Sequence, residues 1–289
     1  MCFRRFPRDT SLIMVSRWAC GRCGFVAWTR DRSEMVDVTG SHLLAHDSDA
    51  LSTSDFRVSW DCPYCATAKT TYDSGGAVAE FKRHLYEHVA DRVADGTHVA
   101  ERVNWDGVVR VDASAAGDEA DALRTHFHAA AGLVVAVTPS PERLVRALDE
   151  ALDAWPRRAV IVSTGEYDFE ATPDVDFQGR NVEIVELDPR LSPAEVGETV
   201  SRILDDNHEP GERVSLEVSV FHQIVAAFDV ERSVAFVRML AARLADAGGV
   251  LQLYVDADAD RNVATVLNLL DETIDLTVAV DDGQFVRRP

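Results

Sequence analysis

The 289-residue sequence predicts an α+β protein in which two small, repeated ββα-like units precede a three-layer α/β domain with a largely parallel sheet. Three observations support this prediction. The first third of the chain repeats itself at an offset of 42 residues, short apolar runs alternate with helical patterns after about Val99, and almost all of the acidic surplus lies in that second part. Residues 1–98 carry a net charge of −1 and residues 99–289 one of −19, which indicates that the two parts have different partners or surroundings.

The composition favours a protein that works in concentrated salt inside a reducing compartment. Acidic side chains outnumber basic ones by 49 to 29, and only two of the basic residues, Lys69 and Lys82, are lysines. This composition resembles that of cytoplasmic proteins from extreme halophiles that accumulate salt. No run of about 18 apolar residues occurs, so no membrane span is predicted. Four of the five cysteines form two C-x-x-C pairs, which argues against a disulfide framework. We interpret residues 1–15 as a tail, with Met14 as an alternative start.

The repeat carries eight residues suited to metal binding. Each copy has the pattern C-x2-C-x18-H-x3-H, and the residues are Cys20, Cys23, His42 and His46, then Cys62, Cys65, His84 and His88. Two thiolates on a tight turn and two imidazoles four residues apart on one helical face can reach a single ion. Sulfur and imidazole ligands in a tetrahedral set select zinc over magnesium or calcium. The sequence therefore predicts two Zn²⁺ ions per chain.

Over residues 16–92 these motifs resemble tandem C2H2-type zinc fingers, which implies a hairpin followed by a helix in each unit. We place finger 1 at residues 16–50 and finger 2 at residues 56–96. The spacing departs from the family because 18 residues separate the second Cys from the first His, where about 12 are usual. Units of about 40 residues cannot close a core unaided, so the metal is expected to supply most of their stability. The 15-residue linker Asp47–Asp61 is expected to keep the two sites independent.

The resemblance to zinc fingers raises the question of DNA binding, because such fingers read bases from helix positions −1, 3 and 6. Counting back from the histidines gives Met35, Val38 and Ser41, then Ala77, Glu80 and Arg83. Only Arg83 is a typical guanine reader, and the acidic linker opposes contact with phosphates. Our first hypothesis is protein binding through three apolar helix residues that we expect to be exposed, namely Met35, Leu44 and Tyr86. The alternative is DNA binding through Lys82, Arg83 and the N-terminal arginines Arg4, Arg5 and Arg8.

The sequence after Val99 predicts alternating strands and helices. The strand candidates are Val108–Val111, Leu133–Thr138, Ala159–Ser163, Val182–Leu187, Val214–Val220, Val250–Val255 and Ile274–Val280. The helix candidates are Glu119–Phe127, Pro141–Ala154, Pro193–Asp206, Val230–Ala247 and Arg261–Leu270. Ser-Pro pairs at two helix starts and a Gly-Gly pair after a third helix are capping signals. Continuous Val, Ile and Leu runs are typical of a parallel sheet that is covered on both faces.

In its layout, the segment 105–289 resembles the RecA-like core of KaiC-type ATPases, and more closely haloarchaeal proteins of unknown function that carry a degenerate version of it. The resemblance implies that Asp112–Glu119 is the phosphate loop and that Glu217 stands at the Walker B position. The loop lacks the lysine and the Ser/Thr of a Walker A motif, and Asp118 and Glu119 would repel phosphates at the helix N-terminus. We therefore expect no nucleotide hydrolysis, and we interpret Glu217 as an ordinary strand-end carboxylate.

The remaining reactive side chains form no recognisable catalytic motif. We assign no catalytic or metal role to His126, His128, His222, Asp256, Asp258 and Asp260. The sequence thus predicts a cytoplasmic, zinc-binding, non-catalytic regulator or adaptor whose fingers and pseudo-ATPase domain bind protein, with no membrane partner and no small-molecule substrate. The alternatives are a DNA-binding transcription regulator and a nucleotide-binding KaiC-like ATPase.

Overall fold

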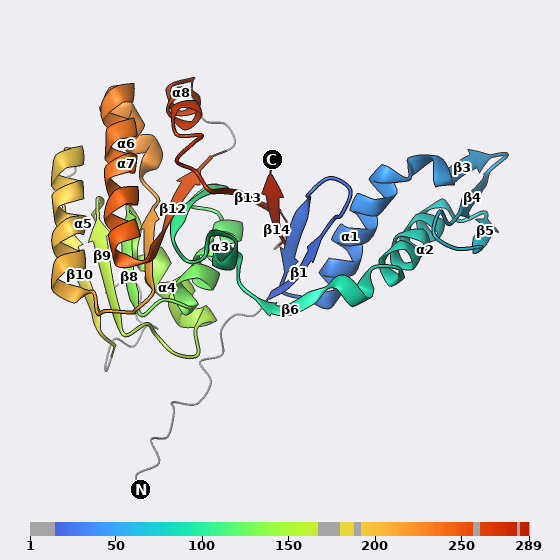
Figure 1. Cartoon of the computed structure of the whole chain (residues 1–289), viewed down its shortest axis with the longest axis horizontal. Helices are drawn as coiled ribbons and strands as arrows, with labels where there is room; N and C mark the ends of the chain where they lie inside the picture. Colours follow the sequence, from blue (N-terminus) through green and yellow to red (C-terminus); the bar gives the residue numbers. More distant parts are fainter. Residues whose placement is uncertain (1–14, 167–179, 188–191, 257–260, 282–283, 289) are drawn as a thin grey trace, which may run out of the picture. The chain divides into compact units, whose positions relative to one another are not determined.

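The computed structural model describes residues 15–166, 180–187, 192–256, 261–281 and 284–288. The chain divides into two compact units, whose elements are labelled in Figure 1. The Cys/His unit comprises Met14–Thr97 together with Gln284–Val286, and the α/β unit comprises His98–Gly283 with Arg287–Pro289. None of the helices within the described ranges combines the length and the apolar composition that a bilayer crossing requires.

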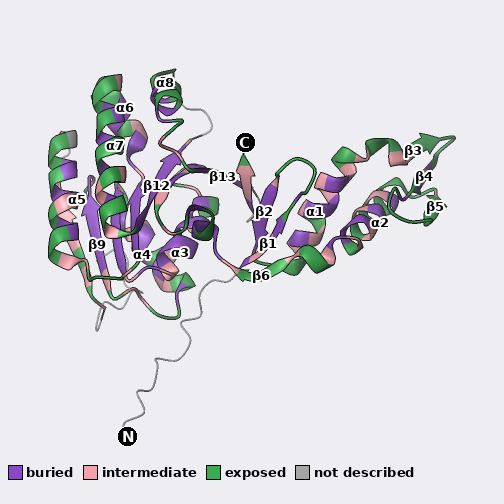
Figure 2. Ribbon diagram, viewed as in Figure 1, coloured by how far each residue is buried: buried purple, intermediate pink, exposed green. Residues whose placement is uncertain are grey.

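Parallel strands form the centre of the α/β unit. Among the described residues the strand order is β10 (Val182–Glu186), β9 (Arg158–Ser163), β8 (Leu133–Thr138), β11 (Val214–Val218), β12 (Gly249–Val255), β7 (Gly107–Asp112) and β13 (Leu276–Asp281). Each coincides with a predicted strand. Strands β8, β11 and β12 are buried along their whole length (Figure 2), as continuous apolar runs in a parallel sheet require.

Helices cover both faces of this sheet (Figure 1). Helices α3 (Asp118–Ala129) and α4 (Pro141–Ala151) lie on one face. The other face is covered by α5 (Pro193–Asn207), α6 (Phe221–Ala227), α7 (Val230–Ala247) and α8 (Arg261–Leu269), whose apolar side chains share one core with the strands. The five predicted helices are confirmed. Helix α6 was not predicted; it begins at Phe221, directly after the predicted strand Val214–Val220.

The two copies of the 42-residue repeat have the same secondary structure. In the first copy, β1 (Val15–Ala19) and β2 (Val26–Thr29) form a hairpin before α1 (Arg32–His46). In the second, β4 (Arg57–Asp61) and β5 (Ala68–Thr71) form a hairpin before α2 (Ser74–Glu87). Asp31 and Asp73 cap the two helices by accepting backbone N–H bonds. The predicted order of hairpin and helix is confirmed.

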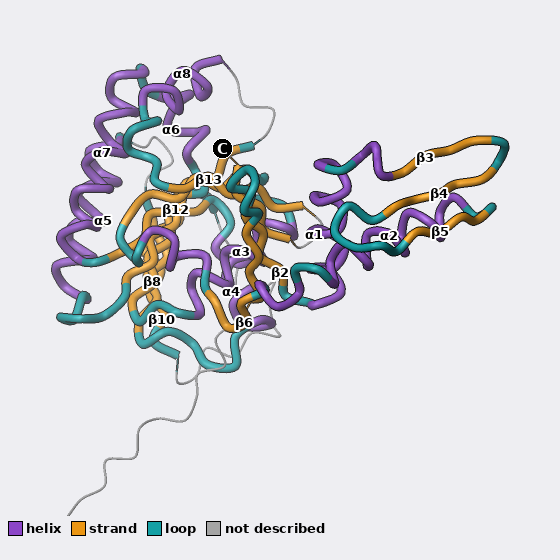
Figure 3. The backbone as a smooth tube through the Cα atoms, turned by 45° about the vertical axis from the view of Figure 1, so that its right-hand side comes forward, coloured by secondary structure: helices purple, strands orange, loops and turns teal. Residues whose placement is uncertain are grey.

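The two copies exchange their last strands. After α1 the chain forms β3 (Leu51–Ser54), which pairs with β4 of the second copy, as Figure 3 shows. After α2 it forms β6 (Ala94–Thr97), which pairs with β1 of the first copy. Both pairings are antiparallel, so the exchange is reciprocal. The C-terminal strand β14 (Gln284–Arg288) adds to β2 at the other edge of the β1 sheet.

One apolar core serves both copies. Its buried members include Trp18, Met35, Leu43, Trp60, Phe81 and Leu85. Helices α1 and α2 lie so close that a Cβ atom added at Gly40 would be 2.5 Å from the Lys82 carbonyl oxygen. The expected linker, Asp47–Asp61, contains β3 and all of β4. The expectation of two independent fingers is therefore wrong, because the segment taken as a linker forms strands and the two copies share one core.

Candidate metal centres and a polar pocket

In the first copy the four predicted ligands converge. Cys20 and Cys23 lie on the turn between β1 and β2, and His42 and His46 lie on the last turns of α1. The Cys23 Sγ is 3.3 Å from the His42 Nε2, and the Cys20 Sγ is 3.6 Å from the His46 Nε2. The two Nε2 atoms are 3.1 Å apart. All four ligand atoms lie within 4.8 Å of one another.

The second copy repeats this arrangement at the end of α2. The Cys62 Sγ is 3.3 Å from the His88 Nε2, and the Cys65 Sγ is 3.3 Å from the His84 Nε2. The two Nε2 atoms are 3.3 Å apart, and the four ligand atoms again lie within 4.8 Å of one another. The structure therefore brings all eight predicted ligands into two groups of four.

In each group, two sulfur–nitrogen pairs and the pair of nitrogens lie at separations close to those of a tetrahedral metal site. Bonds of about 2.3 Å to sulfur and about 2.0–2.1 Å to nitrogen place sulfur and nitrogen about 3.6 Å apart, and two nitrogens about 3.3 Å apart, in a tetrahedron. The observed sulfur–nitrogen distances of 3.3 to 3.6 Å and nitrogen–nitrogen distances of 3.1 and 3.3 Å match these edges. Both groups could hold a metal ion. Four protein ligands would leave no open coordination position, which is typical of structural metal sites.

Hydrogen bonds around the sulfur atoms favour the thiolate, which is the form that binds metal. The backbone N–H groups of Arg22 and Tyr64 each lie 3.4 Å from the first sulfur of their turn and donate to it. Hydrogen bonds with Thr67 lower the pKa of Cys65 to about 6, whereas burial raises the pKa of Cys62. These hydrogen bonds therefore favour the thiolate of Cys65, the form that would bind metal.

A polar bridge joins the two C-x-x-C turns. Arg22 and Tyr64 occupy equivalent positions in these turns. The Arg22 Nη1 donates to the Asp47 Oδ1 at 2.9 Å, and the Tyr64 hydroxyl donates to the Asp47 Oδ2 at 2.8 Å. Burial and this bond to Asp47 raise the pKa of Tyr64 to about 12. Because Asp47 directly follows the ligand His46, the bridge connects the two candidate centres.

The residues expected to contact DNA or protein are placed differently from the prediction. Arg83 is exposed, but Lys82 is half-buried and its Nζ is 3.2 Å from the Asp37 carboxylate of α1. Met35 is fully buried and Tyr86 is 6% exposed, so the expectation that these side chains are exposed is wrong. Both lie in the core shared by the two copies. The third apolar candidate, Leu44, is half-buried and packs against the same core.

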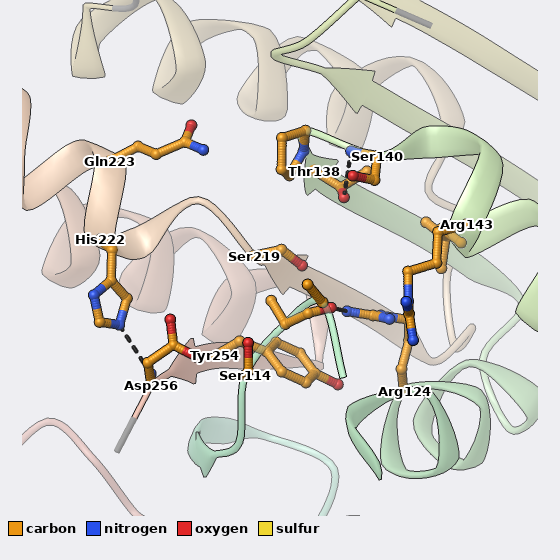
Figure 4. Close-up of a pocket in the computed structure, with 14 residues that line it drawn as sticks. Ser114, Arg124, Thr138, Ser140, Arg143, Ser219, His222, Gln223, Tyr254 and Asp256 are labelled. Atoms are coloured by element: carbon orange, nitrogen blue, oxygen red, sulfur yellow. Dashed lines mark hydrogen bonds between the residues drawn. The ribbon is translucent and has the colours of Figure 1, made fainter. Parts of the chain in front are cut away.

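In the α/β unit, polar side chains gather beyond the C-terminal ends of β7, β8, β11 and β12 (Figure 4). They line a cavity of about 190 Å³. The lining includes Ser114, Arg124, Thr138, Arg143, Ser219, His222, Tyr254 and Asp256. After β8 the chain continues to β9 on one side, whereas after β11 it continues to β12 on the other. Ligands of α/β proteins bind at such a reversal of strand order.

Beneath this cavity, Glu217 is fully buried and paired with Arg124. The Arg124 Nε donates to both carboxylate oxygens at 2.8 and 2.9 Å, and the His128 Nε2 lies 3.0 Å from one of them. Burial would raise the pKa of Glu217, but the charge of Arg124 and the contact with His128 outweigh it and lower this pKa to about 2. The interpretation of Glu217 as an ordinary strand-end carboxylate is therefore wrong.

Arg124 was missed from the sequence, although a signal for it exists. Arg124 and His128 are four residues apart on one face of α3, opposite a glutamate inside an apolar strand. Arg124 also donates to the Ala115 carbonyl at 2.9 Å. It therefore holds the segment Asp112–Glu119, which the resemblance to KaiC-type ATPases implied to be the phosphate loop. An apolar strand rarely contains a carboxylate without a buried partner.

Three histidines that received no role from the sequence, His126, His128 and His222, have structural partners. The His126 Nε2 accepts the Val99 N–H at 3.1 Å, whereas His128 faces Glu217, so the two rings do not share a ligand. The His222 Nε2 accepts the Asp256 N–H at 2.9 Å. Asp258 and Asp260 lie outside the described residues.

Comparisons with known proteins concern mainly the α/β unit. The model of a family of unknown function (DUF7504) matches residues 107–276, and no zinc-finger or RecA/KaiC family matches. No curated protein matches the chain. Similar solved structures include a Pyrococcus horikoshii OT3 protein from a structural study, with 13% identity and a TM-score of 0.41 over 61% of this chain and 82% of that one. Another is an uncharacterized Pyrococcus horikoshii protein in complex with an unknown peptide, with 16% identity and a TM-score of 0.38 over 60% of this chain and 76% of that one.

Proposed function

This chain belongs to the DUF7504 family of unknown function, and we propose that it is a cytoplasmic, non-catalytic adaptor of a halophilic archaeon. In this proposal the Cys/His unit is a zinc-stabilised module of two interlocked fingers. The α/β unit is a RecA-like, KaiC-like domain that has lost nucleotide hydrolysis. Both units bind protein partners.

Zinc is the ion that the donor atoms of the Cys/His unit favour. Each group offers two sulfurs and two imidazole nitrogens, and this set suits tetrahedral Zn²⁺ better than the hard, oxygen-seeking Mg²⁺ or Ca²⁺. The bound ions would close the two turns onto the helices. Because the copies exchange strands and share Asp47, the two zinc ions would stabilise one module.

The packing of α1 against α2 is the observation that carries the adaptor proposal. A DNA-reading finger presents helix positions −1, 3 and 6 to the major groove. Met35 and Ala77, which occupy position −1 in the two copies, are 0% and 1% exposed. Each helix therefore covers part of the face that the other would need for base contacts. DNA binding in the known finger geometry would require the shared core to open.

The ion pair between Arg124 and Glu217 supports the loss of nucleotide hydrolysis. In P-loop enzymes a Walker B carboxylate holds Mg²⁺ and a lysine contacts the phosphates. Here the carboxylate binds an internal guanidinium, and the expected loop has no lysine. Asp118 and Asp121, which pair with Arg143 at 2.6 and 2.7 Å, add negative charge beside the loop.

The test separates protein binding from DNA binding in molar KCl. Selection from random duplexes with the zinc-loaded chain should return no enriched motif, and Arg83→Ala should behave as the wild type. If the selection returns one enriched motif and this motif is lost in Arg83→Ala, the adaptor proposal is contradicted and a DNA-binding transcription regulator is supported. A nuclease-treated pull-down should recover a defined protein partner that is lost when the metal is removed.

A second measurement addresses the ATPase alternative. Calorimetric titration with ATP and Mg²⁺ should show no binding in the micromolar range and no hydrolysis. Hydrolysis that disappears in Glu217→Gln would contradict the proposal, because it would require Glu217 to act on Mg²⁺ and not on Arg124.

A further inference from the structure

We propose that the outer edge of β5 in the Cys/His unit pairs with the same edge of a second molecule of this protein, so that two three-stranded sheets join into one. The inference concerns self-association and does not rest on the adaptor role. It starts from the internal repeat, because the first repeat copy contains the equivalent edge with a strand already paired to it.

The repeat makes β5 the counterpart of β2, which lies 42 positions earlier. Around the first copy the strand order is β14, β2, β1 and β6, so β14 covers the outer edge of β2. In the second copy the corresponding order is β5, β4 and β3 (Figure 3), and among the described residues no strand lies beyond β5. The edge of β3 is different, because its counterpart β6 also ends its sheet. The edge of β5 is therefore covered in one copy and open in the other.

The backbone groups that this edge offers follow from the pairing of β5 with β4. The Cys62 N–H donates to the Thr67 carbonyl at 2.9 Å, just before β5 begins. Hydrogen-bonded and non-hydrogen-bonded pairs alternate along an antiparallel ladder. The next residue, Ala68, therefore directs its N–H and C=O away from β4, and so does Thr70.

The first copy shows these outward groups in use. The Cys20 N–H donates to the Phe25 carbonyl at 2.8 Å, so the alternation is the same as in the second copy. Trp28 is the counterpart of Thr70, and it is paired with Phe285 of β14. The outward groups of β5 thus occupy the position at which the fold already binds an antiparallel strand.

The edge of β5 lacks the features that protect natural edge strands, which are prolines, bulges and free charges. Its Ala68, Lys69 and Thr70 are exposed, and its register with β4 is continuous. The Lys69 Nζ is bound to both carboxylate oxygens of Glu80 at 2.5 and 2.6 Å, which neutralises its charge. Residues 1–98 carry a net charge of only −1, so contact between two Cys/His units meets little repulsion.

The side chains of β5 complement one another when a twofold axis passes through Thr70. Thr70 then faces Thr70 of the second molecule, and such a pair exchanges both N–H···O=C bonds. Ala68 faces Tyr72, whose ring is 71% exposed, and the small side chain leaves room for that ring. Lys69 faces Thr71, so no like charges are opposed. An axis through Lys69 would oppose two lysines, which disfavours that register.

The experiment measures sedimentation of the full zinc-loaded chain in molar KCl between about 1 and about 200 μM. The wild type should change from monomer to dimer, with a Kd in the micromolar range. Thr70→Pro removes the outward N–H but no bond to β4, and should weaken dimerisation at least tenfold. Thr53→Pro is the matched control on β3. Thr53 is opposite Val58, whose backbone groups point to β5, so its own N–H also faces outward, and dimerisation should be unchanged.

A second measurement does not require the proline variant to fold. Thr70→Asp and Thr70→Lys each oppose two like charges across the axis and should each dimerise at least tenfold more weakly. An equimolar mixture should restore the dimer, because opposite charges then meet. This comparison uses the lowest KCl concentration that leaves the circular dichroism unchanged, since salt screens the charges.

Three results would overturn the proposal. A wild type that stays monomeric at about 200 μM would leave the edge of β5 to a strand of a different protein. Equal weakening by Thr53→Pro and Thr70→Pro would place the interface elsewhere or assign the effect to misfolding. A mixture of Thr70→Asp and Thr70→Lys that dimerises no better than either variant alone would exclude the pairing of Thr70 with itself.

Discussion

The Cys/His unit and the α/β unit achieve a stable structure by different means. Strands β8, β11 and β12 of the α/β unit are completely buried between helices, whereas β3 and β5 of the Cys/His unit are mostly exposed (Figure 2). A large parallel sheet buries enough apolar surface to stabilise itself. The small unit joins two copies into one core and adds two groups of four ligands. We therefore expect the stability of the α/β unit to depend on apolar burial and that of the Cys/His unit to depend on metal.

The two units also place their buried charges differently. In the Cys/His unit the reactive groups converge on positions that an external ion would fill. In the α/β unit the carboxylate of Glu217 is already neutralised by the internal cation Arg124. Removal of metal should therefore destabilise the Cys/His unit, whereas loss of the Glu217 charge should destabilise the α/β unit.

The largest effect is expected from Cys62→Ser. Structural zinc contributes about 10–16 kcal/mol in small domains, and the exchanged strands and the Asp47 bridge connect the two centres. The variant should lose both zinc equivalents and unfold the whole Cys/His unit, while the α/β unit keeps its far-ultraviolet circular dichroism. Metal analysis and the fluorescence of Trp18 and Trp60, which both lie in the shared core, measure this loss.

This prediction differs from the sequence-based expectation that the linker Asp47–Asp61 keeps the two sites independent, under which Cys62→Ser would unfold the second copy alone. Ala66→Ser changes a non-ligand beyond the same C-x-x-C turn and should retain two zinc equivalents. A Cys62→Ser protein that holds one zinc in a folded first copy would show that the centres are independent.

The next largest effect is expected from Glu217→Gln, in the other unit. Removal of one partner of a buried ion pair costs about 3–5 kcal/mol, because the remaining charge loses much of its compensation. Arg124 would keep only its bonds to Asp121 and the Ala115 carbonyl. Urea denaturation should show this loss in the α/β unit, with the zinc content unchanged. The double variant Arg124→Met, Glu217→Leu should be less destabilised than Glu217→Gln, and equal destabilisation would argue against an ion-pair effect.

Local patterns predicted the metal ligands and the α/β strands from the sequence. The Cys and His residues of each group follow from spacing within one hairpin and one helix, and strands such as Leu133–Thr138 are continuous apolar runs. The ligand pattern depends on residues that are close in sequence, and the strand pattern depends on burial of both faces of the strand. Each can therefore be recognised from a single segment of the sequence.

Features that depend on distant pairings were missed. Strand β3 has the sequence Leu-Ser-Thr-Ser, which lacks the alternation of a half-buried strand and forms only because β4 lies beside it. Met35 and Tyr86 are buried in the core that the two copies share. Counting helix positions within one finger does not take the other copy into account. Arg124 and Glu217 are 93 residues apart. In each case tertiary contact determines a conformation or a burial that local propensity leaves open.

A smaller, pH-dependent effect is expected at His98, at the start of the α/β unit. Burial is the main cause that lowers the pKa of His98 to about 4. Its Nδ1 accepts the Ala100 N–H at 3.0 Å and its Nε2 donates to the His126 carbonyl at 2.9 Å, so no nitrogen is free for a second proton. The unfolded chain takes up this proton near pH 6.5. The stabilisation is therefore complete above pH 6.5 and is lost as the pH falls toward 4, by about 3 kcal/mol.

Hydrogen exchange of the segment around His98 checks this prediction without interference from metal loss elsewhere. His98→Asn keeps an acceptor near the Ala100 N–H but cannot titrate, so the protection of its neighbours should depend less on pH between 6.5 and 4. The same pH dependence in the variant would assign the effect to other groups.

The smallest expected effect is a gain in the Cys/His unit from Phe56→Gly. Asp55 and Phe56 form the two-residue turn between β3 and β4, and both have positive φ angles, 49° and 65°. Such turns favour Asn-Gly or Asp-Gly, and a side chain in this left-handed region costs about 1–2 kcal/mol. Phe56 is 93% exposed and so contributes little packing. Glycine is more flexible in the unfolded chain, and the entropic cost of ordering it offsets part of this gain. Phe56→Gly should therefore stabilise the zinc-loaded unit by about 0.5–1 kcal/mol in denaturant titrations. Phe56→Ala keeps a Cβ atom in the strained position and should give a smaller gain, whereas a loss of stability in Phe56→Gly would show that the exposed ring makes a contact that stabilises the hairpin.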